Sequence, residues 1–256
     1  MNRKEHIEIL EPTAFKRLVG IKRSTYNKAY KILEVKQAMV LKNGKGGRPP
    51  KLTITDKLLI TLTYLREYRT LLHIAFEYGV SEATTSRIVK EVEDILVKHT
   101  DFRLPGKKVL SETSYEFVVI DATEIEIDRP KKKQNEYSSG KKKEHTIKAQ
   151  ITISSKKQII CTSICEGKHH DFQLFKASRL PIKNETTVYV DSGYQGIQKI
   201  HSKSNLPKKR SKNNPLSDND KRDNRLNASV RIIVEHINAK LKVFKILGTQ
   251  YRNRRA

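Results

Sequence analysis

The segment VVIDATEIEID (residues 118–128) decides the fold of the second half of the chain, because its β-branched apolar run ends at the carboxylate of Asp121. The segment TTVYVDSGYQG (residues 186–196) repeats this pattern, and its apolar run ends at Asp191. A third acidic residue, Glu235, lies in SVRIIVEHINAKLKVFKIL (residues 229–247), whose apolar spacing is helical. Two carboxylates at strand ends and one on a later helix could converge on a pair of divalent cations.

Four strand-like segments are expected in this half of the chain, and the first and the last of them carry the two aspartates. The first three are YEFVVID, HTIKAQITIS and QIICTSIC, and a short helix over residues 171–178 follows them. The fourth strand precedes Asp191, and a long helix is expected to begin at about Ala228. This order predicts a mixed-sheet α/β domain over residues 116–256. In open α/β sheets ligands gather in the crevice at strand ends, although a turn or a helix cap explains either aspartate alone.

The first hundred residues are predicted to be a helical DNA-binding region, followed by a linker at 101–115. Residues 53–99 fit a helix-turn-helix, in which Gly79 makes the turn and Ser81 caps the second helix. The candidate DNA contacts on that helix are Thr84, Thr85, Arg87 and Lys90. A plain helical hairpin remains the alternative. The segment NGKGGRPP (residues 43–50) is expected to be a loop, either a linker or a basic arm on DNA.

Charge favours a nucleic-acid partner, since the formal net charge is +24 and the pI is about 9.9. A solvated surface or a general bias toward lysine gives the same charge, and an acidic membrane surface is a competing partner. No apolar run approaches the roughly 20 residues that span a bilayer, and the start MNRKEHIEIL lacks a signal-peptide core. Cys161 and Cys165 are expected to be free thiols, so we expect a reduced, cytoplasmic protein without a membrane partner.

Glu235 has a weaker case than the two aspartates when it is taken alone. The apolar stripe of its helix is predicted to run through Val230, Ile233, Ile237, Leu241 and Phe244. Glu235 lies roughly opposite that stripe at about 100° per residue, as an ordinary surface glutamate does. The neighbours on its face that could bind substrate phosphates are Arg231, Asn238 and Lys242.

Other polar segments offer supporting roles. The triplet Lys141, Lys142 and Lys143 is either a solvated hairpin or a clamp that holds DNA near the carboxylates. His170 and Asp171 precede the short helix, where Asp171 is predicted to be the N-cap and either residue could support the site. The rival carboxylates near Asp121 are expected to be mostly solvated, and they are Glu124, Glu126 and Asp128.

Taken together, several segments resemble a bacterial insertion-sequence DDE transposase of the insertion-sequence-five family, which is related to Harbinger elements. They occur in the order VVIDATEIEIDRP, YSSGKKKEHTIKAQ, HHDFQLF, YVDSGYQGI, LPKKR and RIIVEHINAKLKVFKIL. The resemblance covers nearly the whole chain, including the helix-turn-helix. It implies a ribonuclease-H-like catalytic domain in which Asp121, Asp191 and Glu235 hold two Mg²⁺ (or Mn²⁺) ions. Asp171 matches the aspartate of the histidine–aspartate pair that precedes a short helix in this family.

The resemblance also implies an activity. Such a protein binds the terminal inverted repeats of its element as double-stranded DNA, cleaves the ends and joins the 3′ hydroxyls to target DNA. It would work as a homo-oligomer on the nucleoid. Two alternatives stay open, namely a non-catalytic helix-turn-helix protein and a ribonuclease-H-like nuclease that only hydrolyses. Similar proteins usually continue past YRNRR with another helix, so we expect a shortened copy that transposes poorly.

Overall fold

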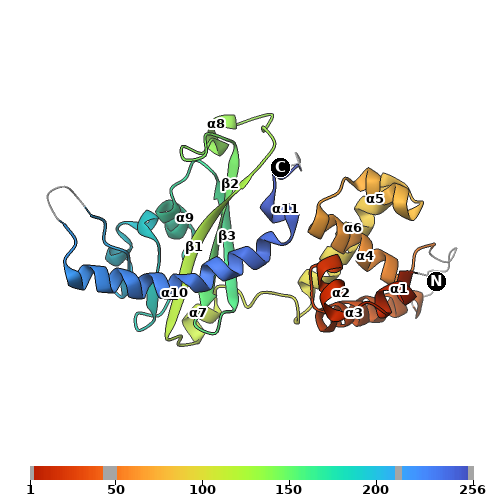
Figure 1. Cartoon of the computed structure of the whole chain (residues 1–256), viewed down its shortest axis with the longest axis horizontal. Helices are drawn as coiled ribbons and strands as arrows, with labels where there is room; N and C mark the ends of the chain where they lie inside the picture. Colours follow the sequence, from red (N-terminus) through yellow and green to blue (C-terminus); the bar gives the residue numbers. More distant parts are fainter. Residues whose placement is uncertain (1–2, 43–50, 211–214, 253–256) are drawn as a thin grey trace. The chain divides into compact units, whose positions relative to one another are not determined.

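The computed structural model describes residues 3–42, 51–210 and 215–252, and it divides into two compact units (Figure 1). The first unit is Met1–Arg103 with Lys242–Ile246, and the second is Leu104–Leu241 with Leu247–Ala256. The segment NGKGGRPP, expected to be a loop or a basic arm, lies outside the described residues. Among the described helices, none combines the length and the apolar composition needed to cross a bilayer.

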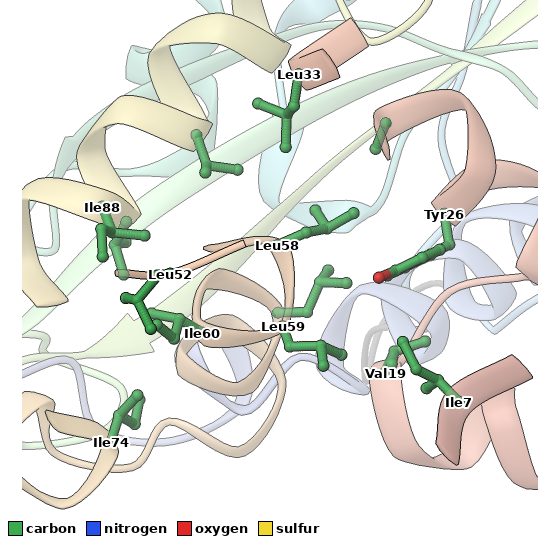
Figure 2. Packing of buried hydrophobic residues seen from close by; sticks show 14 of the residues in the cluster. Ile7, Val19, Tyr26, Leu33, Leu52, Leu58, Leu59, Ile60, Ile74 and Ile88 are labelled. Carbon is green, nitrogen blue, oxygen red and sulfur yellow. The ribbon is translucent and has the colours of Figure 1, made fainter. Parts of the chain in front are cut away.

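The described part of the first unit is helical. Its helices are α1 (Arg3–Glu8), α2 (Pro12–Val19), α3 (Arg23–Lys42), α4 (Ile54–Glu67), α5 (Leu71–Tyr78) and α6 (Glu82–Lys98). Helix α4 contacts α3, α5 and α6, and its residues Leu58, Leu59 and Ile60 are buried in the shared core. Figure 2 shows these side chains packed with Tyr26 of α3 and Ile88 of α6.

The expected helix-turn-helix is confirmed in α5 and α6. Gly79 ends α5 with a left-handed backbone (φ 60°), a conformation that glycine adopts without steric cost. The Ser81 side chain then accepts a hydrogen bond from the backbone N–H of Thr84, which caps α6 as predicted. Ile88, Val89 and Val92 bury one face of α6 in the core of the unit.

The second unit contains a mixed sheet with the strand order β3-β2-β1-β4-β5. Its strands are β1 (Phe117–Glu126), β2 (Thr146–Ser154), β3 (Ile159–Glu166), β4 (Thr187–Tyr189) and β5 (Ser204–Asn205). The pairs β1–β2 and β2–β3 are antiparallel, whereas β1–β4 and β4–β5 are parallel. The helical segments of this region are α7 (Val109–Glu112), α8 (Gln134–Tyr137), α9 (Asp171–Ser178), α10 (Asp218–Lys242) and the 3₁₀ turns η1 (Ser192–Tyr194) and η2 (Ile197–Lys199). The short helix α11 (Lys245–Gly248) follows α10 in the chain.

Helices cover the sheet on both faces. On one face Phe175 of α9 packs with Val118 and Ile120 of β1. On the other face Val234 and Ile237 of α10 pack with Val119. Because side chains alternate along a strand, the odd-numbered residues of β1 from Phe117 onward point toward α10 and the even-numbered ones toward α9. Figure 1 shows α10 running across the strands.

The structure corrects four details of the expected fold. Helix α10 begins at Asp218 rather than near Ala228, since its first turns are polar and give no apolar signal. Its buried stripe includes Val234, which is 0% exposed, and Phe244 lies beyond the end of the helix. The expected linker 101–115 contains α7, whose residue Leu110 is buried in the second unit. Strand β1 continues past Asp121 to Glu126, so this aspartate is not at a strand end.

Candidate active site

The parallel pairing of β1 and β4 places Asp121 and Asp191 at the same level of the sheet. Val119 and Tyr189 are the last register partners of these two strands. Asp121 follows Val119 by two residues, and Asp191 follows Tyr189 by two residues. Strand β4 ends there, and the chain enters the turn η1 with Asp191 as its N-cap. Asp121 continues in β1 opposite Ile151 of β2. Asp121 and Asp191 therefore both follow the last β1–β4 register pair, although β1 itself runs on to Glu126.

Helix α10 covers Asp121 with two polar side chains. Asn238 Nδ2 donates to Asp121 Oδ2 at 3.1 Å, and Arg231 Nη2 lies 4.0 Å from Asp121 Oδ1. Glu235 lies between them on the same helix face, four residues after Arg231 and three before Asn238. Its side chain is exposed, and its neighbours one turn away on either side both reach Asp121. The face that carries Glu235 is therefore the face turned toward Asp121.

Burial and neighbouring negative charges shift the pKa of Asp121. Burial raises the pKa of Asp121 from 3.8 to about 6, the charges of Asp191 and Asp171 add to the rise, and Arg231 and Asn238 oppose it. The carboxylates thus stand close enough to repel one another. A divalent cation between them would remove this repulsion, and carboxylate oxygens are the ligands that Mg²⁺ takes in proteins. The donor set of Asp121 and Asp191 fits such an ion.

The third carboxylate does not join the first two in the side-chain positions described. Among the described residues, no group of three His, Cys, Asp or Glu side chains lies close enough together to hold a metal ion. The structure brings Asp121, Asp191 and Asp171 near one another, and it leaves Glu235 exposed on α10.

The α9 face of the sheet holds an ion network that the sequence did not reveal. The Nζ atom of Lys148, a residue of β2, lies 2.9 Å from Asp171 Oδ1 and 3.4 Å from Glu124 Oε1. Glu124 was expected to be solvated, yet its side chain is only 13% exposed and accepts from Ser139 Oγ at 2.7 Å. Burial alone would lower the pKa of Lys148, but hydrogen bonds and the charges of Asp171 and Glu124 raise it, so Lys148 stays protonated.

The residues before α9 are arranged differently from the prediction. His170, not Asp171, is the N-cap of α9, and its backbone N–H donates to Gln173 Oε1 at 3.3 Å. Asp171 is the first helical residue, which leaves its carboxylate directed at Lys148 and at the η1 turn. Asp171 therefore adjoins the site, whereas the His170 side chain is exposed.

Among the candidate DNA contacts of α6, Arg87 and Lys90 are exposed as predicted, and Thr84 is half-buried beside Ser81. Thr85 was expected to be exposed, and this is wrong, because Thr85 is 0% exposed and its Oγ1 donates to the Ser81 carbonyl. Its spacing of three and four residues from Ile88 and Val89 places it on the buried face.

The basic candidates of the second half occupy different places. Lys141, Lys142 and Lys143 are exposed in the turn before β2, and Lys142 pairs with Glu126 at 2.9 Å. Arg231 is directed at Asp121, so its charge is already engaged with a carboxylate in this structure. Lys242 is exposed and groups with the first unit rather than with the carboxylates.

Two family models match the chain. One described as "DDE superfamily endonuclease" matches residues 120–256, and one described as "Helix-turn-helix of DDE superfamily endonuclease" matches residues 50–102. These ranges coincide with the sheet-containing region and with the helix-turn-helix that the structure shows.

Curated relatives agree with these matches. "Probable transposase for insertion sequence element IS702" from Microchaete diplosiphon is 44% identical over 253 residues, which are 98% of this chain and 91% of that protein. "Putative transposase for insertion sequence element IS112" from Streptomyces albus G is 22% identical and covers 93% of this chain and 86% of that protein. The solved structure "Crystal structure of a pre-cleavage Mos1 transpososome" matches at 12% identity over 70% of this chain and 66% of that one, with a TM-score of 0.22.

Proposed function

Because the chain belongs to the DDE superfamily endonucleases and carries their helix-turn-helix, we propose that it transposes an insertion sequence by cleaving its ends and joining them to target DNA. The ribonuclease-H-like fold expected for such an enzyme is confirmed, with a mixed sheet covered by helices on both faces. Members of this superfamily generally use divalent metal ions. The observation that carries the proposal is the shared level of Asp121 and Asp191 at the end of the β1–β4 pairing, under the face of α10 that carries Glu235.

The proposed metal ligands are Asp121, Asp191 and Glu235, with Mg²⁺ or Mn²⁺ as the pair of ions. When bound, two such ions activate the attacking oxygen and stabilise the leaving oxygen of a phosphodiester. Burial raises the pKa of Asp121 only to about 6, so this carboxylate is ionised above that pH, and the positive charge of Arg231 lies beside it. Asn238 fixes the second oxygen of Asp121, so its first oxygen points in a defined direction.

The DNA partner is double-stranded, and both ends of the element must be held for joining, so we propose a homo-oligomer that works on the nucleoid. Lys141, Lys142 and Lys143 are exposed on the second unit and would contact phosphates without reading sequence. Recognition of the terminal inverted repeats is assigned to α6, where Arg87, Lys90 and the partly exposed Thr84 are available to the major groove.

Arg87→Ala is expected to weaken binding to the terminal repeat by roughly 1–3 kcal/mol, because an exposed arginine early in a recognition helix can read a base edge. Fluorescence anisotropy with repeat and scrambled duplexes at one salt concentration measures this. Lys98→Ala at the far end of α6 removes the same charge and should lower both affinities alike. An equal loss on both duplexes for Arg87→Ala would mean that Arg87 contacts only phosphate.

The test of the proposed function uses a labelled duplex that ends in the terminal repeat with a free 3′ hydroxyl. In Mn²⁺ the full-length protein should join this end to a supercoiled plasmid, which produces labelled open circles on a gel. A duplex with a 2′,3′-dideoxy end is the matched control, because it lacks the attacking hydroxyl. Nicking without joining would identify a hydrolytic nuclease, and binding with neither reaction would identify a DNA-binding protein without catalysis.

A further inference from the structure

The Lys148 network is a buried charge cluster on the sheet face opposite α10, and the proposed mechanism does not use it. The side chains of Lys148 and Glu124 are 10% and 13% exposed, and that of Asp171 is 25% exposed. Placing charges there costs desolvation, and apolar residues of similar volume often stabilise such a position equally well.

One end of the network is anchored to the sheet. Glu124 and Lys148 are register partners on β1 and β2, so the backbone pairing fixes their separation. Ser139, which is 1% exposed, donates its hydroxyl to Glu124 Oε2 at 2.7 Å and holds that carboxylate. Lys148 consequently extends from a rigid base toward α9.

The other end of the network lies against the turn that carries Asp191. A Cβ atom on Gly193 would lie 2.8 Å from Asp171 Oδ2 and 3.0 Å from Asp191 Oδ1, so both carboxylates pack onto this glycine. The Gly193 N–H donates to Asp191 Oδ1 at 2.8 Å. Asp171 thus lies directly against the peptide that orients the Asp191 carboxylate.

Asp171 and Asp191 carry like charges and meet at Gly193, so they would repel each other without a nearby cation. Lys148 supplies that cation through its 2.9 Å contact with Asp171 Oδ1. We propose that Lys148 is a positioning residue of the metal site, because it holds Asp171 against Gly193 and so sets the direction of Asp191. The proposal rests on the proposed function, since it assigns a role in a metal site.

Isothermal titration calorimetry measures the affinity of the full-length protein for Mn²⁺ alone. The rate of end cleavage is the second readout. Lys148→Met and Asp171→Asn should each weaken Mn²⁺ binding roughly tenfold, the range seen when supporting residues of metal ligands are removed. Because both substitutions break one contact, the double variant should be no weaker than the poorer single variant. Affinity for DNA should stay unchanged. Asp171→Asn keeps the side-chain shape and tests the contact even if Lys148→Met fails to fold.

Lys156→Met in the β2–β3 turn and Asp218→Asn at the start of α10 change the same charges at exposed positions and serve as controls. Asp121→Asn distinguishes a failure of the proposed metal site from a failure of the positioning role. If Asp121→Asn leaves Mn²⁺ affinity unchanged, the proposed function fails. If it weakens binding while Lys148→Met and Asp171→Asn do not, only the positioning role is wrong. A loss in Asp171→Asn as deep as that in Asp121→Asn would make Asp171 a ligand and overturn the positioning role.

Discussion

Asp121→Asn is expected to reduce metal-dependent cleavage of a terminal-repeat duplex by on the order of a thousandfold, because it removes one of the carboxylate charges that we propose as metal ligands. Asparagine has nearly the same volume and can still accept from Asn238, so the fold and DNA affinity should persist. Asp191→Asn and Glu235→Gln should show losses of the same order. Gel assays of nicking in Mg²⁺ and Mn²⁺ provide the rates, and chelation with EDTA should abolish the wild-type activity reversibly.

Glu126→Gln is the matched control, since it removes a carboxylate from the same strand at a site paired with Lys142. It should cleave within a few-fold of wild type. Wild-type rates in Asp121→Asn would exclude Asp121 from the site. Wild-type rates in Glu235→Gln alone would leave the two aspartates in place and move the third ligand elsewhere.

The same Asp121→Asn substitution is expected to stabilise the metal-free protein at pH 8 by about 2–3 kcal/mol. Burial raises the pKa of Asp121 from 3.8 to about 6, so the folded state binds this proton more tightly than the unfolded state does. Protonated Asp121 therefore makes its full contribution to the free energy of unfolding below pH 3.8. The wild-type protein loses this contribution as the pH rises through about 6. Asparagine never ionises, so it avoids that loss.

Urea unfolding in EDTA at several pH values measures the difference between the two proteins. The gain from Asp121→Asn should be near zero at pH 4 and reach its plateau by pH 7. Asp218→Asn is the control, because the Asp218 side chain is 97% exposed and should give no such pH-dependent gain. A gain that does not vary with pH would show that the carboxylate of Asp121 is not destabilised in the fold.

Much of the fold could be predicted because its signals are local. The apolar runs marked β1 to β4, and Gly79 with Ser81 marked the helix-turn-helix. The start of α10 could not be placed, since its first three turns are mostly exposed and lack an apolar stripe. The misplacement of Thr85 was avoidable, because its spacing from Ile88 and Val92 is that of the buried face.

The site was predictable only in part. Asp121 and Asp191 end apolar runs, which is a sequence signal, but their common level depends on the register of β1 with β4. Nothing in the spacing separated Glu235 from an ordinary surface glutamate, and its assignment came from the family resemblance. Lys148 and Glu124 were missed because an ion pair between two strands depends on their register. The one available signal was that Lys148 is the only charged residue in the segment TIKAQITIS.

The pairing of β1 with β4 limits how a lineage carrying this domain can change in length. The Val119–Tyr189 pair sets the level of both aspartates through backbone hydrogen bonds, and side-chain identity contributes little to it. A single inserted or deleted residue between Val119 and Asp121 would turn Asp121 to the opposite face, toward α9. Sequence drift in the strands should therefore consist of substitutions, with length differences among descendants confined to connections such as residues 128–145 and 179–186.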